Sequence, residues 1–379
     1  MSSPDSPNTQ QTNNKKPSSL AVISLITVLV AISIAFLLSY ATNNIDPNSN
    51  STANLFQLRQ FFRPTSSSSS GLITTAGKES LKSAIASQPY QKQKFDPVKK
   101  DKMRTPVYFL SHGGPSIMYD DKHPAYSKLA QIGREITTKV KPRAVVVFSA
   151  HWQAGRDTVQ VNTAEITDLI YDFYGFPSHY YKEKFPNVGS KELAEKVLGL
   201  LGKVGIKAEG VKRGLDHGVW ASFKCAFEPD SNPLNVPIVQ VSLFKSEDPI
   251  QHYRLGQAVS ELRDENILII VSGMAVHNLR DLQFTRGDPK PLPYTASFDE
   301  ALKDAVTTAP ADREKAMADL LKRPDARQAH PYFDHLLPIH IGAGAAGDDL
   351  GKRLWTLKEG SMSWAQYRFG EVANSSSFL

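Results

Sequence analysis

The chain has 379 residues, of which 41% are hydrophobic and 22% are charged, a composition typical of globular proteins. The net charge of +6 is concentrated in residues 1–104, which carry 12 Lys/Arg against 5 Asp/Glu, whereas the remainder carries 32 against 33. This near-neutral remainder argues against a nucleic-acid partner. Cys225 is the single cysteine, which excludes an intrachain disulfide and zinc sites built from cysteine pairs. Its apolar neighbours predict a buried, inert thiol.

The first predicted element is an apolar segment near the N-terminus. After a polar tail over 1–19, residues 20–38 carry no charge and would span roughly 28 Å as a helix, close to the thickness of a bilayer core. This length favours a transmembrane anchor over 20–41, although "SYA" at 39–41 leaves cleavage of a signal peptide open. Lys15 and Lys16 precede the segment, so the positive-inside rule places the following domain on the non-cytosolic side. The expectation is a single-pass membrane protein.

Residues 42–104 are rich in Ser, Asn, Gln and Lys, which predicts a disordered linker. A short helix near 77–87 is the one regular element that we expect within it. The pattern changes to alternating strands and helices at Pro106, so we expect a globular domain over 105–371 and a C-terminal tail over 372–379.

Four apolar runs in this domain predict buried strands, at 106–110, 144–149, 237–244 and 267–273. Helices are predicted over 190–204, which begins at a Ser190 cap, and over 249–265, which begins with Pro249. The alternation predicts an α/β fold, a single domain with a mostly parallel or mixed central sheet flanked by helices. "GAGAAG" at 342–347 matches G-x-G-x-x-G, but no isolated strand precedes it. Close helix packing through small residues is therefore favoured over a dinucleotide site.

Histidines mark the ends of the predicted strands. His112, His151 and His277 lie at or just beyond three strand ends, where ligands bind in α/β folds. His217 in "GLDHGVW" and His335 in "YFDHLLP" add two more. Each alone could be a structural, hydrogen-bonded histidine. Together they indicate a metal site, because imidazole is the commonest metal ligand, and the glycines after His112 would let the backbone approach a ligand.

Aromatic side chains near these histidines suggest a site for an aromatic substrate. "YDFYGFP" supplies Tyr171, Phe173 and Tyr174, and Trp152 adjoins His151. Core packing is an equally good explanation of these residues. The chain has no H-E-x-x-H, P-loop or G-x-S-x-G motif.

Seven blocks, in order, resemble the class III extradiol ring-cleavage dioxygenases, specifically their DOPA 4,5-dioxygenase-like branch. The blocks are "LSHGGP", "SAHW", "YDFYGFP", "LDHGVW", "SGMAVHNLRDL", "HPYFDHLLP" and "YRFG", between Pro106 and Gly370. The resemblance implies that residues 105–371 form a catalytic domain that cleaves the ring of a catechol with O2. It also implies a small aromatic diol, DOPA-like, as the substrate.

The resemblance assigns metal ligation to His112, His151 and His335. It makes His277 either a further metal ligand or the catalytic acid/base, and it places His217 as a catalytic residue that lines the substrate and oxygen pocket. Asp334 could supply an oxygen ligand or support His335. This branch carries a histidine where the better-known branch completes its ligand set with a carboxylate.

Fe(II) is the expected metal, because O2 chemistry needs a redox-active ion and Zn(II) has no accessible second oxidation state. Zn(II) is the alternative occupant of the same site. Two rival functions stay open at this point. They are a zinc-dependent hydrolase and a non-catalytic metal-binding module on the same fold.

Overall fold

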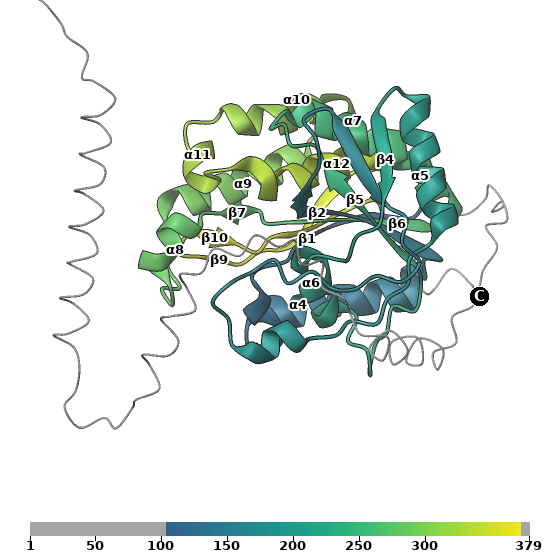
Figure 1. Ribbon diagram of the computed structural model, residues 1–379. Helices are drawn as coiled ribbons and strands as arrows, with labels where there is room; N and C mark the ends of the chain where they lie inside the picture. The colour runs from purple at the N-terminus through teal and green to yellow at the C-terminus, as the bar shows by residue number, and fades with distance from the viewer. Residues whose placement is uncertain (1–103, 373–379) are drawn as a thin grey trace, which may run out of the picture. The chain divides into compact units, whose positions relative to one another are not determined.

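In the computed structural model, which describes residues 104–372, an eight-stranded mixed sheet forms the centre of the fold (Figure 1). Its strands lie in the order β4 (Lys207–Val211), β3 (Thr158–Asn162), β5 (Ile238–Leu243), β2 (Ala144–Gln153), β6 (Ile267–Gly273), β1 (Val107–Ser111), β11 (Gln366–Phe369) and β8 (Gly351–Trp355). A small second sheet has the order β7 (Val276–His277), β10 (Met362–Ser363) and β9 (Lys358–Glu359). The four predicted strands are confirmed as β1, β2, β5 and β6.

The central strands are apolar along their whole length because both faces of the sheet are covered. On β1, Val107 and Phe109 face one buried cluster, whereas Tyr108 and Leu110 face another. β6 pairs in parallel with β1 on one side and with β2 on the other, and β11 and β8 add an antiparallel edge. The predicted α/β fold with a mixed sheet is confirmed.

Helices form the two outer layers. The α-helices are α4 (Pro124–Glu135), α5 (Lys191–Lys203), α6 (His217–Ala226), α7 (Pro249–Val259), α8 (Leu279–Thr285), α9 (Pro293–Thr307), α10 (Pro310–Asp319), α11 (Ala326–Ala329) and α12 (Leu337–Ala346). Short 3-10 helices are η2 (Pro115–Tyr119), η4 (Ser178–Lys182), η5 (Ser260–Glu265), η6 (Leu320–Lys322) and η7 (Phe333–His335), and η3 (Ile136–Val140) is a π-helical turn. Figure 1 shows α4 and α6 on one side of the sheet and α7, α10 and α12 on the other.

Local sequence signals explain where two of these helices begin. The Ser190 hydroxyl accepts a hydrogen bond from the backbone N–H of Leu193 and caps α5, as predicted. The predicted helix over 249–265 begins at Pro249, but its α-helical part ends at Val259 and η5 completes it. Its cap is Asp248, whose carboxylate accepts from two backbone N–H groups.

The "GAGAAG" segment packs α12 against α7. A Cβ atom on Gly344 would overlap the carbonyl oxygen of Tyr253, and one on Gly256 would overlap that of Ile341. The predicted packing role of these small residues is confirmed. Cys225 is buried as predicted, and burial raises the pKa of its thiol to about 12.

The predicted tail 1–19, the anchor 20–41, the short helix near 77–87 and all but the last residue of the linker 42–104 lie outside the described residues. Within residues 104–372, no helix has the length and apolarity needed to cross a bilayer. The longest of these helices, α9, has 15 residues, whereas a span needs about 20. The prediction of a single-pass membrane protein is contradicted by this finding, and we withdraw it together with the membrane as a partner. The domain boundaries 105–371 and 372–379 stay predictions.

Candidate metal centre

Parallel strands bring the predicted histidines to one edge of the sheet. β6 lies between β1 and β2 and is parallel to both, so their carboxyl ends meet. His112 follows β1, His151 lies near the end of β2, and His277 belongs to β7, just after β6. His335 reaches the same place from η7. The predicted gathering of histidines at neighbouring strand ends is confirmed.

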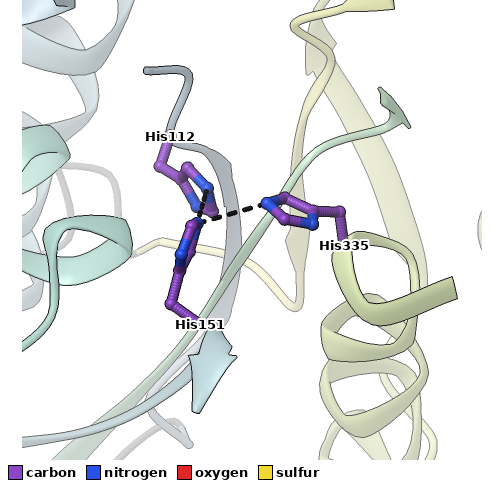
Figure 2. A group of neighbouring side chains, drawn as sticks. All are labelled: His112, His151 and His335. Atoms are coloured by element: carbon purple, nitrogen blue, oxygen red, sulfur yellow. Dashed lines mark hydrogen bonds between the residues drawn. The ribbon is translucent and has the colours of Figure 1, made fainter. Parts of the chain in front are cut away.

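Figure 2 shows the rings of His112, His151 and His335 pointing toward one another. Nε2 of His151 lies 3.2 Å from Nε2 of His112 and 3.2 Å from Nε2 of His335. His112 and His335 are buried, and His151 is partly buried. Three nitrogens from distant parts of the chain therefore share one small, largely enclosed space.

The other ring nitrogen of two of these histidines faces a carboxylate. Nδ1 of His151 lies 3.0 Å from Oδ2 of Asp172, and Nδ1 of His335 lies 3.0 Å from Oδ1 of Asp334. Since an ionised carboxylate can only accept, each Nδ1 carries the proton and each Nε2 keeps its lone pair. Asp334 thus contacts the far side of the His335 ring, which favours a supporting role over direct ligation.

The contact with Ser272 shows which ring nitrogen of His112 carries the proton. Nδ1 of His112 lies 2.9 Å from Oγ of Ser272. The Ser272 hydroxyl donates its single hydrogen to the carbonyl oxygen of Gly218, so its oxygen accepts from Nδ1–H of His112. The third Nε2 therefore also presents a lone pair.

These three lone pairs fit a metal ion. Facing lone pairs repel each other unless a cation lies between them. Imidazole nitrogens about 2.1 Å from a common ion lie about 3.0–3.4 Å apart for coordination angles between octahedral and tetrahedral. The observed separations of 3.2 Å from His151 to each neighbour fall in this range, so the donor set is suited to an ion held by His112, His151 and His335.

Asp172 links this cluster to His217. Its Oδ1 lies 2.9 Å from Nδ1 of His217 and also accepts the backbone N–H of that residue, while its Oδ2 faces His151. The rings of His151 and His217 lie 4.0 Å apart. Although burial of Asp172 acts to raise the pKa of its carboxyl, its contacts with the two imidazoles hold that pKa well below its usual range. Asp172 therefore carries a negative charge next to the cluster.

The protein environment shifts the pKa values of these histidines in different directions. Burial, together with the neighbouring imidazoles, lowers the pKa of His112, His335 and His277 well below the ordinary value. Burial also lowers the pKa of His217, despite the opposing effect of Asp172. For His151 burial is the largest single effect and acts downward, but the contact with Asp172 and the negative charges of Asp172, Asp216 and Asp334 together outweigh it and raise the pKa.

His277 stands apart from the converging nitrogens. Its ring stacks on that of His335, with centroids 3.7 Å apart and an angle of 9° between the planes. It does not belong to the group of three histidines whose nitrogens lie within 4.8 Å of one another. This position favours the acid/base alternative for His277 over metal ligation.

The four predicted substrate-binding residues occupy different environments. Phe173 is buried, and its ring lies 5.5 Å from that of His217. The Tyr171 hydroxyl donates to the carbonyl oxygen of Glu183, and Tyr174 is 90% exposed. Trp152 donates from Nε1 to Gln160 and lies under the guanidinium of Arg213. The contacts of Phe173 support its assignment to the substrate pocket. The contacts of Trp152 and the exposure of Tyr174 do not support that assignment for these two residues.

The glycine that follows His112 packs closely against another part of the fold. Gly113 has a φ of 64°, which favours glycine, and a Cβ there would overlap the ring of Trp364. The close approach that the structure shows at Gly113 is to a tryptophan of the fold, and the expected approach of this backbone to a ligand stays a prediction.

Residues that orient the site histidines were missed in the sequence. Asp172 lies within "YDFYGFP", where a carboxylate between aromatic residues was the available signal. Ser272 is the last residue but one of an apolar strand and gave no such signal. Asp216 is fully buried and accepts hydrogen bonds from Ser149 and Gln240, so the "DHG" block holds a structural carboxylate beside His217.

Comparison with known proteins identifies the family. The family described as "Catalytic LigB subunit of aromatic ring-opening dioxygenase" matches residues 106–370. This chain belongs to that family. The resemblance to class III extradiol dioxygenases of the DOPA-dioxygenase-like type is therefore confirmed, and the chain is an extradiol ring-cleavage dioxygenase.

Two relatives of this LigB-family chain share one name. The protein "4,5-DOPA dioxygenase extradiol" of Beta vulgaris is 37% identical over 271 residues, which cover 69% of this chain and 96% of the relative. Its namesake in Escherichia coli strain K12 is 31% identical, covering 70% and 95%. The crystal structure of an uncharacterized Escherichia coli K12 protein matches with a TM-score of 0.57 and 28% identity, covering 70% of this chain and all of that one. The enzyme class disfavours the hydrolase and non-catalytic alternatives.

Proposed function

We propose that this LigB-family chain is a non-haem Fe(II)-dependent dioxygenase that cleaves the ring of a DOPA-like catechol with O2. The observation that supports it best is the convergence of three Nε2 lone pairs, from His112, His151 and His335, in a chain of a ring-opening dioxygenase family. The names of its relatives support a DOPA-like substrate.

His112, His151 and His335 would hold the metal. When bound there, Fe(II) would supply redox chemistry toward the diol and O2, whereas Zn(II) would not, because it has no accessible second oxidation state. Asp172, Ser272 and Asp334 hold the three rings with Nε2 directed inward. These contacts strengthen the ligands and fix their orientation.

Proton transfer falls to His277 and His217. A catechol must lose protons to chelate a metal, and a neutral imidazole can accept one. The lowered pKa values of both side chains keep them neutral near pH 7. His277, stacked on His335, is the proposed acid/base. His217, between Asp172 and the ring of Phe173, lines the pocket for the substrate and O2.

Aromatic faces near His217 suit a planar ring. Phe173 lies next to His217, and Tyr171 contacts Phe173 edge to face. We assign these two to the wall of the substrate pocket. Trp152 and Tyr174 stay sequence predictions.

Anaerobic reconstitution tests the function. The protein is freed of metal with a chelator, loaded with Fe(II) or Zn(II) without air, and mixed with aerated DOPA and other catechols. We expect the Fe(II) protein alone to consume O2 and to form a ring-opened semialdehyde that absorbs visible light. A catechol panel that leaves O2 and absorbance unchanged, with Fe(II) bound, would refute the proposal.

A further inference from the structure

An arginine close in sequence to one of the site histidines has no function in the proposed reaction so far. Among all Lys and Arg of the chain, only Arg213 and Arg280 lie within four residues in sequence of one of the five histidines considered above. Arg213 is already engaged, since Nη1 lies 3.2 Å from Oδ2 of Asp216 and its guanidinium covers Trp152. Arg280 is exposed. Within residues 104–372, no carboxylate lies at ion-pair distance from it.

Arg280 contacts the segment that carries His335. Its Nη2 lies 3.5 Å from the hydroxyl of Tyr332, and its guanidinium carbon lies 5.5 Å from the centroid of that ring. Tyr332 lies three residues before His335, and Arg280 lies three residues after His277. The rings of His277 and His335 stack. The Arg280–Tyr332 pair therefore joins the same two segments as the stacked histidines, farther toward solvent.

The backbone beneath Arg280 is held in place. Asn278 is 4% exposed, and its Oδ1 accepts the backbone N–H groups of Arg280 and Asp281 at the start of α8. Its Nδ2 donates to the carbonyl oxygen of Gln328. Figure 1 shows α8 directly after β7. The Cα atoms of Arg280 and His277 are at most about 11 Å apart along three peptide units, so the backbone of Arg280 stays close to that of His277.

We propose that Arg280, together with the hydroxyl of Tyr332, binds a carboxylate on the side chain of the catechol substrate. This rests on the proposed function, because it requires the catechol ring at the metal centre. A guanidinium recognises a carboxylate through two parallel hydrogen bonds, and Arg280 has no competing acidic partner among the described residues. Tyr332 is 65% exposed, so its hydroxyl is accessible from the same side.

Three catechols separate recognition of the carboxylate from recognition of the ring. DOPA and 3,4-dihydroxyphenylpropionate carry the carboxylate, whereas 4-methylcatechol does not. With Arg280→Gln in the Fe(II) protein, we expect kcat/KM for the first two to fall about 10- to 100-fold, mainly through KM. The value for 4-methylcatechol should not change. Arg280→Lys should recover part of the loss, since it keeps the charge but not the planar fork.

A matched control and a second readout complete the experiment. Arg286→Gln removes the other arginine of this region, the exposed residue at the end of α8, and should leave all three substrates unaffected. Anaerobic titration of the metal-loaded proteins gives Kd values for the same catechols without turnover. The Kd of the carboxylated compounds alone should rise with Arg280→Gln.

The possible failures are distinguishable. Equal losses on all three catechols, or no loss on any, would overturn the assignment of Arg280 while leaving the ring-cleavage proposal intact. If the unmodified Fe(II) protein cleaves none of the three, the proposed function fails and the assignment fails with it.

Discussion

At the scale of single residues, the orientation of the site histidines depends on Asp172. One carboxylate faces Nδ1 of both His151 and His217. In Asp172→Asn, an amide group replaces one acceptor oxygen with a donor, so one imidazole loses its partner. We expect the affinity for Fe(II) or Zn(II) to fall about 10- to 100-fold, as measured by competition with a chromophoric chelator.

The control for this prediction lies in the same segment. Asp168 has an exposed side chain, and Asp168→Asn removes the same charge at a distance from the ring nitrogens. It should leave the metal affinity unchanged. An unchanged affinity in Asp172→Asn as well would show that the carboxylate does not orient the ligand.

A second prediction at this scale concerns whether His277 is a metal ligand or the acid/base. The two functions differ in whether a substitution of His277 changes the metal content. In His277→Phe, the aromatic ring can still stack on His335 while the titrating nitrogens are lost. We expect the metal content to stay at the level of the unmodified protein and kcat to fall about 10²- to 10⁴-fold. Metal analysis and O2 uptake on one preparation measure both. Loss of the metal would instead identify His277 as a ligand.

At the scale of elements, the contact between α7 and α12 supports the side of the sheet opposite α6. Because a Cβ on Gly344 would overlap the carbonyl oxygen of Tyr253, Gly344→Ala must push the two helices apart. We expect a loss of about 1–3 kcal/mol in the free energy of unfolding, as measured by urea denaturation.

Gly199 offers the matched control for this substitution. It lies inside α5, and no heavy atom is within 4 Å of a Cβ built there. Gly199→Ala should stabilise the protein by about 0.5–1 kcal/mol, because alanine loses less backbone freedom in a helix. A stabilising Gly344→Ala would contradict the close packing.

At the scale of the whole molecule, the sequence predicts individual helices and strands better than it predicts contacts between remote segments. Apolar runs such as 267–273 and the Ser190 cap identify their own elements, and the parallel order of the strands then brings His112 and His151 to one edge. Position in the chain does not reveal which way a ring points. The stacking of His277 on His335 and the bridge formed by Asp172 depend on side-chain directions that arise only when remote segments pack.

Buried histidines outside the metal centre make the folded state sensitive to acid. His340 is fully buried in α12, and its two ring nitrogens face the carbonyl oxygens of Met317 and Leu336. Burial lowers the pKa of His340 to about 4, and the same is true of His330. In the unfolded chain each titrates near 6.5. The unfolded state therefore binds more protons between pH 6.5 and 4, and stability falls as the pH falls through this range.

We expect each of these two histidines to remove about 3 kcal/mol from the free energy of unfolding between pH 6.5 and pH 4. His340→Gln keeps a side-chain donor but does not titrate, so its stability should decline by about 3 kcal/mol less over this interval. Urea denaturation at a series of pH values measures the difference in stability between the unmodified protein and His340→Gln. The contribution of the metal centre cancels in this difference, because both proteins contain the same centre. Above pH 7 the two curves should run parallel. An equal acid-side slope in both proteins would mean that His340 takes up its proton without unfolding.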